Sequence, residues 1–118
     1  MMDLHGSTTD FQERLLATFW REAQGHIDAM TPLLAWLEPA ASGDNQARAL
    51  ERLFREAHGL KGAAQVVDRP EIAAQSRQLE RLVMSVRQCE QPITSAQAAA
   101  LVDAVAATQH VVLRDKQG

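Results

Sequence analysis

Residues 57–62 read AHGLKG, a stretch that combines a histidine, a lysine three positions later and two glycines. A neutral imidazole nitrogen is a good nucleophile at cellular pH. A phosphoryl group in transfer carries negative charge, which a nearby ammonium group stabilises. We therefore interpret His58 as a candidate nucleophile and Lys61 as its charge-balancing neighbour, in a phosphoryl transfer that depends mainly on positioning and electrostatics.

The two glycines of this stretch are unusual because the hydrophobic spacing around them predicts a helix. Each glycine inside a helix costs about 1 kcal/mol relative to alanine. Gly62 lies one turn after His58 on the same side of the helix, where it presents no side chain to an approaching molecule. An open reactive face therefore explains Gly62, and close helix packing at Gly59 and Gly62 is the alternative. The sequence offers no firm physical reason for Gly59.

A helical wheel drawn at about 100° per residue separates His58 from the predicted core. The apolar positions of this segment centre between Leu53 and Ala57, and His58 falls at the edge that faces water. For His58 taken alone, the alternative interpretation is an exposed histidine without a role. For the charged residues around it, the alternative is a solvated charged face. The residues on the same side, which we expect to face a partner, are Glu51, Arg55, Gly62 and Gln65.

The period of the apolar residues predicts helices and no strands. The first helix is expected to begin after Thr9, with Gln12 as the partner of Thr9 in a capping box, and to end by Pro39. Pro32 is expected to kink or restart it, because proline removes one hydrogen bond of the helix. The second helix, over about residues 46–66, carries the candidate site.

A break separates the second helix from a third, which is expected to continue to about Gln88. Asp68 and Glu71 have capping-box spacing at its start. A fourth helix is expected to begin near Thr94, with Gln97 as its capping-box partner.

These four amphipathic helices with short connections predict an all-α protein, an antiparallel four-helix bundle. The length of 118 residues fits one domain with one core, and we expect residues 1–118 to form a single domain with an ordered core of about 9–112. The tail after residue 113 is expected to fray.

The composition and charge argue against several classes of protein and of binding site. The formal charge of −3 and the lack of a basic cluster argue against a nucleic-acid partner. Cys89 is the only cysteine, and His5, His26 and His110 are scattered, so no metal site and no cofactor are predicted. No apolar run approaches the roughly 20 residues of a membrane span, and no secretory signal is evident. We therefore expect a cytoplasmic protein without membrane contact.

Three stretches resemble one known family. EAHGLKGAA (56–64) is similar to the H-x-x-K-G signature of histidine phosphotransfer (HPt) domains. LLATFWREAQGHIDAM (15–30) resembles the first helix of the HPt domain that heads chemotaxis-type, CheA-like histidine kinases. PEIAAQSRQLERLV (70–83) resembles the helix that packs beside the phosphorylated one. The resemblance extends over about residues 11–105.

The resemblance implies roles for four residues. His58 matches the phosphorylated histidine, Lys61 the lysine beside the phosphoryl group, and Gly62 the glycine that keeps the site open. Glu80 stands where a CheA-like glutamate accepts a hydrogen bond from the other imidazole nitrogen, which makes the reactive nitrogen more basic. A surface ion pair with a nearby arginine, Arg77 or Arg81, is the alternative for Glu80.

This chain departs from the family pattern in two places. Many members have a glycine ten residues after the histidine, where this chain has Asp68, a residue that tolerates turn conformations. CheA-type domains often have a fifth helix, and the residues here allow at most a short one.

The resemblance implies a phosphocarrier in a two-component or chemotaxis-like phosphorelay. The expected partners are the catalytic domain of a histidine kinase, in cis or in trans, and the receiver domain of a response regulator. No ATP-binding motif is evident, so we expect a monomeric carrier that forms part of a histidine kinase rather than a complete enzyme. Two alternatives are a non-catalytic HPt-like interaction module and the dimerisation domain of a sensor kinase.

Overall fold

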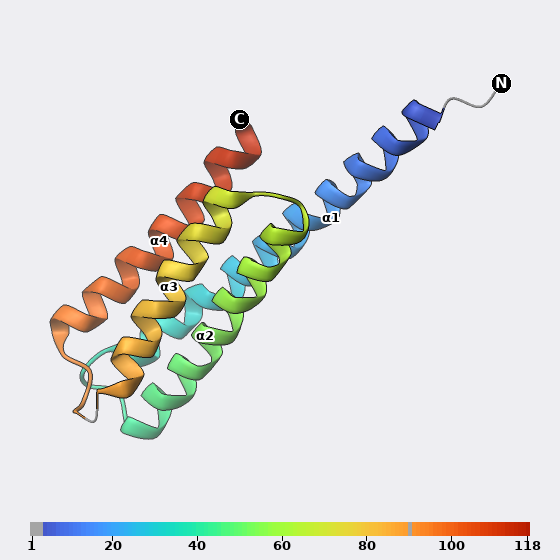
Figure 1. Ribbon diagram of the computed structural model, residues 1–118. Coiled ribbons are helices and arrows are strands. Elements are labelled where there is room, and N and C mark those ends of the chain that lie inside the picture. The colour runs from blue at the N-terminus through green and yellow to red at the C-terminus, as the bar shows by residue number, and fades with distance from the viewer. Residues whose placement is uncertain (1–3, 90) are drawn as a thin grey trace.

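The structure is a computed structural model that describes residues 4–89 and 91–118. Its four α-helices run antiparallel to their chain neighbours and form one elongated bundle (Figure 1), which confirms the predicted all-α four-helix bundle. A single 3-10 turn, η1, follows the first helix. The elements are α1 (Leu4–Leu33), η1 (Leu34–Leu37), α2 (Gly43–Val66), α3 (Pro70–Gln88) and α4 (Ser95–Gln117).

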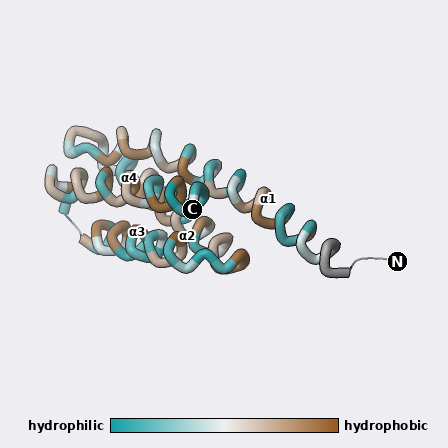
Figure 2. The backbone as a smooth tube through the Cα atoms, turned by 90° about the horizontal axis from the view of Figure 1, so that it is seen from above, coloured by the Kyte–Doolittle hydropathy of each residue, from teal (hydrophilic) through white to brown (hydrophobic). Residues whose placement is uncertain are grey.

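Helix α1 is longer than the sequence predicts. It begins at Leu4, so the expected start after Thr9 is wrong, and its N-terminal part projects beyond the other helices (Figures 1 and 2). Pro32 lies in its last turn, where the α-helix gives way to η1 after Leu33. The proline therefore lies at the end of the helix rather than kinking its middle, where it removes one backbone hydrogen bond, the one to the carbonyl of Asp28.

Helices α2 and α4 are capped by side chains at their N-termini. The Ser42 hydroxyl accepts a hydrogen bond from the backbone N–H of Asn45, so α2 starts three residues earlier than predicted. Thr94 and Gln97 form the predicted capping box of α4, which satisfies two backbone donors that would otherwise have no partner. Helix α4 continues to Gln117, so the tail expected to fray is helical.

The turn between α2 and α3 differs from the prediction. Asp68 does not cap α3: its backbone adopts a left-handed φ of 56°, and Arg69 takes the N-cap position without a side-chain hydrogen bond. Pro70 opens the helix, where its missing N–H has no consequence. Aspartate tolerates this conformation better than most residues, which explains how Asp68 can stand where the resemblance led us to expect glycine.

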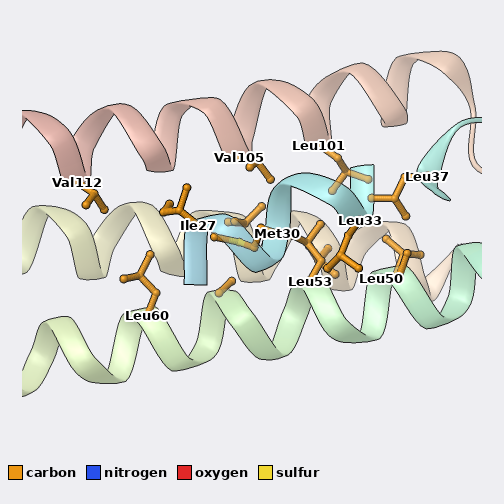
Figure 3. Close-up of a cluster of buried hydrophobic side chains, with 14 of the residues drawn as sticks. Ile27, Met30, Leu33, Leu37, Leu50, Leu53, Leu60, Leu101, Val105 and Val112 are labelled. Carbon is orange, nitrogen blue, oxygen red and sulfur yellow. The ribbon is translucent and has the colours of Figure 1, made fainter. Parts of the chain in front are cut away.

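The core lies between the inward faces of all four helices (Figure 3). Its side chains follow the three- and four-residue spacing of amphipathic helices, with Ile27 and Met30 of α1 meeting Leu53 and Leu60 of α2. Packing of this core sets the separation and rotation of α2 and α3, the two helices that carry the candidate site.

Helix α4 is long and apolar enough to cross a membrane by length and composition alone. Its apolar residues are valines and leucines together with alanines, which are good helix formers. Leu101, Val105 and Val112 of this helix lie in the bundle core. Packing in the bundle accounts for these three residues, whereas Val102 and Leu113 of the same helix are exposed. One such helix is weak support for a membrane span.

Candidate functional site

His58 lies on the exposed side of α2 and is hydrogen-bonded to α3. Its side chain is 64% exposed, and its Nδ1 lies 2.9 Å from Oε2 of Glu80. The Glu80 side chain is only 9% exposed. The structure thus places an accessible imidazole against a nearly buried carboxylate, at the pair for which the resemblance implied a hydrogen bond.

Lys61 pairs with the other oxygen of the same carboxylate. Its Nζ lies 2.6 Å from Oε1 of Glu80, and its side chain is 19% exposed. The sequence suggested an ammonium free to swing toward a group on His58, whereas in this state the ammonium is held by Glu80. The alternative surface pair of Glu80 with Arg77 or Arg81 does not form: the two carboxylate oxygens face His58 and Lys61 instead.

The charge of Glu80 is stabilised by these two partners. Burial alone raises the pKa of the Glu80 carboxyl, because it penalises the charged form. Hydrogen bonds and positive charge from Lys61 and His58 outweigh burial and hold this pKa below its ordinary value of 4.5. Glu80 is therefore an ionised acceptor at neutral pH.

The contact with Glu80 determines which imidazole nitrogen can react. An ionised carboxylate can only accept hydrogen bonds, so Nδ1 of His58 must be the donor. In the neutral ring the lone pair then lies on Nε2, at the other side of the imidazole. Nε2 is the atom that this arrangement prepares as a nucleophile.

The two glycines of α2 have different surroundings. A Cβ added to Gly62 would meet no other atom within 4 Å, as expected for an open face beside His58. A Cβ added to Gly59 would lie 2.7 Å from Cε1 of His26, on α1. Nδ1 of His26 is held 2.7 Å from Oε2 of Glu56. Gly59 therefore makes room for an interhelical histidine, a reason that no local sequence pattern revealed.

The other residues expected to face a partner lie on the exposed surface of α2. Arg55 and Glu51 form an ion pair with a separation of 2.6 Å between Nη2 and Oε1. Gln65 is also exposed.

Phe54, one turn before His58 on α2, was not singled out from the sequence. Its ring stacks on the His58 ring, with centroids 6.1 Å apart and planes at 14°. The four-residue spacing between Phe54 and His58 was the available signal.

The remaining histidines do not extend this site. His26 belongs to the contact with Glu56, His110 is exposed on α4, and the side chain of His5 lies outside the described part. In residues 4–89 and 91–118, no three histidine, cysteine, aspartate or glutamate side chains are grouped to hold a metal ion.

Comparison with known protein families decides the class of this site. Residues 14–111 match the model of the Hpt domain. The chain belongs to the Hpt family. It is thus a histidine phosphotransfer domain of a phosphorelay, and domains of this family interact with histidine kinases and receiver domains. The Hpt match covers α2 and α3 entirely, together with most of α1 and α4. Searches of curated proteins and of solved structures found no match.

Proposed function

We propose that His58 is the phosphoacceptor of this Hpt domain and that Nε2 is the atom that carries the phosphoryl group. The observation that carries the proposal is the hydrogen bond from Nδ1 to the buried Glu80 carboxylate, which leaves the lone pair on the accessible nitrogen. Gly62, one turn away, leaves room for a protein that brings the phosphoryl donor.

The transfer step uses groups that this chain supplies. The Nε2 lone pair attacks the phosphorus atom, a P–N bond forms, and the bond from phosphorus to the leaving oxygen breaks with its electron pair. ADP is the leaving group when a kinase domain is the donor, and an aspartate carboxylate when a receiver domain is the donor. The imidazole retains its proton on Nδ1 and gains positive charge, which the Glu80 carboxylate stabilises.

Lys61 has an indirect part in this proposal. Its ammonium neutralises and holds Glu80 in the unphosphorylated state, so that the carboxylate remains in place beside Nδ1. It also adds positive charge near the site, which favours a bound phosphoryl group.

The finer assignment is a CheA-like domain that heads a chemotaxis-type histidine kinase. Support comes from the similarity of residues 15–30 to the first helix of such domains. In this proposal residues 1–118 are one cytoplasmic domain. A kinase catalytic domain, in cis or in trans, phosphorylates His58, and a response-regulator receiver accepts the phosphoryl group. Glu51, Arg55 and Gln65 contact the partner beside His58.

The experiment is phosphorylation with a histidine-kinase catalytic domain and ATP, or with a phosphorylated receiver domain. We expect phosphate that is labile in acid and stable in alkali, as for a phosphorylated histidine, and its complete loss in His58→Gln. His110→Gln is the matched control, because His110 is also exposed but lies on α4. Labelling that persists in His58→Gln would exclude His58 as the acceptor.

A further inference from the structure

We propose that Phe54 is a positioning residue for the His58 imidazole and that Arg87 acts on the imidazole through Phe54. This inference rests on the phosphoacceptor function proposed above. Phe54 lies one turn before His58 on α2, and their rings stack at 6.1 Å with an angle of 14° between the planes. The guanidinium carbon of Arg87, on α3, lies 5.8 Å from the centroid of the Phe54 ring.

The His58 ring needs a second contact because one hydrogen bond does not define its plane. The bond to Glu80 holds Nδ1, but a side chain that is 64% exposed has little other packing to stop rotation about that bond. A ring stacked on one face restricts this rotation. The hydrogen bond and the stacked ring together define the direction of the Nε2 lone pair, on which an in-line attack on phosphorus depends.

Arg87 connects the stacked ring to α3. Its guanidinium lies within the range of a cation–π contact with Phe54, which is half-buried at the edge of the core. Glu80 is on the same helix as Arg87, so α3 supplies both the hydrogen bond to His58 and the cation–π contact to Phe54. A shift of α3 relative to α2 would therefore change these two contacts together.

The test separates positioning from packing with Phe54→Leu, which keeps an apolar side chain but removes the ring. We expect ¹⁵N NMR to show a lower fraction of His58 with its proton on Nδ1. We also expect phosphorylation by phosphoramidate, a small donor that needs no docking surface, to be about three- to tenfold slower. Arg87 is exposed, so Arg87→Gln should fold normally. We expect its phosphorylation by phosphoramidate to be about two- to threefold slower.

The coupling between the two residues is tested by combining them. If Arg87 acts through Phe54, the double variant is no slower than Phe54→Leu alone. Arg81→Gln is the matched control, because it removes a positive charge from the exposed side of the same helix and should leave both measurements unchanged.

Unchanged tautomer and unchanged phosphoramidate rate in Phe54→Leu would overturn the inference. The inference would also be overturned if Phe54→Leu were phosphorylated more slowly only with a receiver domain as donor, because Phe54 would then act in docking the partner. A failure of the proposed function is recognised separately, by phosphate that remains on His58→Gln.

Discussion

At His58 the two nitrogens of one ring have opposite environments. Nδ1 is bonded to a carboxylate that is almost fully buried, whereas the side chain as a whole is 64% exposed. Glu80 also forms an ion pair with Lys61, so the charged groups beneath the ring form one connected network. Such a network orients the imidazole and keeps one nitrogen available for chemistry.

Removing the charge of Glu80 tests this network. We expect Glu80→Gln to slow phosphorylation of His58 about tenfold or more, because the amide is a weaker acceptor and no longer fixes the tautomer. The rate with phosphoramidate measures this effect without a partner. Glu71→Gln is a control, because Glu71 is exposed on the same helix. An unchanged phosphorylation rate in Glu80→Gln would show that Glu80 does not orient the His58 imidazole.

The lowered pKa of Glu80 also predicts how stability depends on pH. The folded-state pKa lies below 4.5, so the ionised carboxylate contributes stability that is fully present above about pH 4.5 and is lost as the pH falls through the folded-state value. Between about pH 6 and about pH 3, the free energy of unfolding measured with urea should therefore fall more in the native chain than in Glu80→Gln. Equal losses would contradict the charge network.

Sequence reasoning identified most residues of this site but not all of their contacts. His58 and Gly62 follow from residue type and helical spacing, because these determine which face of a helix a residue occupies. Glu80, on another helix, was implied only by the resemblance to HPt domains. The pairing of Lys61 with Glu80 and the stacking of Phe54 on His58 depend on side-chain rotamers and on the separation of α2 and α3. Local spacing does not specify either of these.

At the scale of the helices, α1 and α2 are joined by a specific polar contact beside the site. His26 of α1 bonds to Glu56 of α2, and its ring covers Gly59. Because the imidazole is held by Glu56, it cannot move away from a new side chain at position 59 without losing that bond. Gly59 and Gly62 therefore have different functions, although the sequence presents them as a pair.

Matched alanine substitutions distinguish the two glycines. Gly62→Ala should raise the free energy of unfolding by up to about 1 kcal/mol, since alanine favours the helix and its Cβ meets open space. Gly59→Ala should lower it, because the Cβ would lie 2.7 Å from the His26 ring. Urea unfolding of both variants gives the comparison.

A rescue experiment tests the cause assigned to Gly59. In a His26→Ala background the ring is absent, and Gly59→Ala should become neutral or stabilising. If Gly59→Ala stabilises the native chain as much as Gly62→Ala does, the close approach of α1 has no energetic consequence.

Helix boundaries show where sequence patterns are sufficient. The capping box of Thr94 and Gln97 was predicted correctly, because both partners are local in the chain. Asp68 and Glu71 have the same spacing, yet Asp68 adopts a left-handed conformation and does not cap α3. The spacing of two residues therefore predicts a possible cap, whereas the path of the turn decides whether it forms.

At the scale of the whole molecule, the bundle presents His58 on the outer side of α2 rather than in a closed pocket. A substrate that is itself part of a protein needs such an open site. Large apolar side chains that are exposed are spread over different elements: Phe11, Leu15, Trp36, Val66, Met84, Val102 and Leu113. Exposed apolar residues distributed in this way are common on monomers.

We therefore expect this chain to be monomeric in solution. Sedimentation equilibrium should give a single species near the chain mass of 13.0 kDa. A monomer excludes the dimerisation domain of a sensor kinase, which must pair to form its bundle. A concentration-independent dimer would favour that alternative and would contradict the proposed monomeric carrier.

The central claim is that Nε2 of His58 carries the phosphoryl group. After phosphorylation of the ¹⁵N-labelled protein, coupling between ³¹P and ¹⁵N in the NMR spectrum identifies the bonded nitrogen. We predict phosphate on Nε2 of His58, with the proton retained on Nδ1 beside Glu80. Phosphate on Nδ1, or on any residue other than His58, would contradict the account.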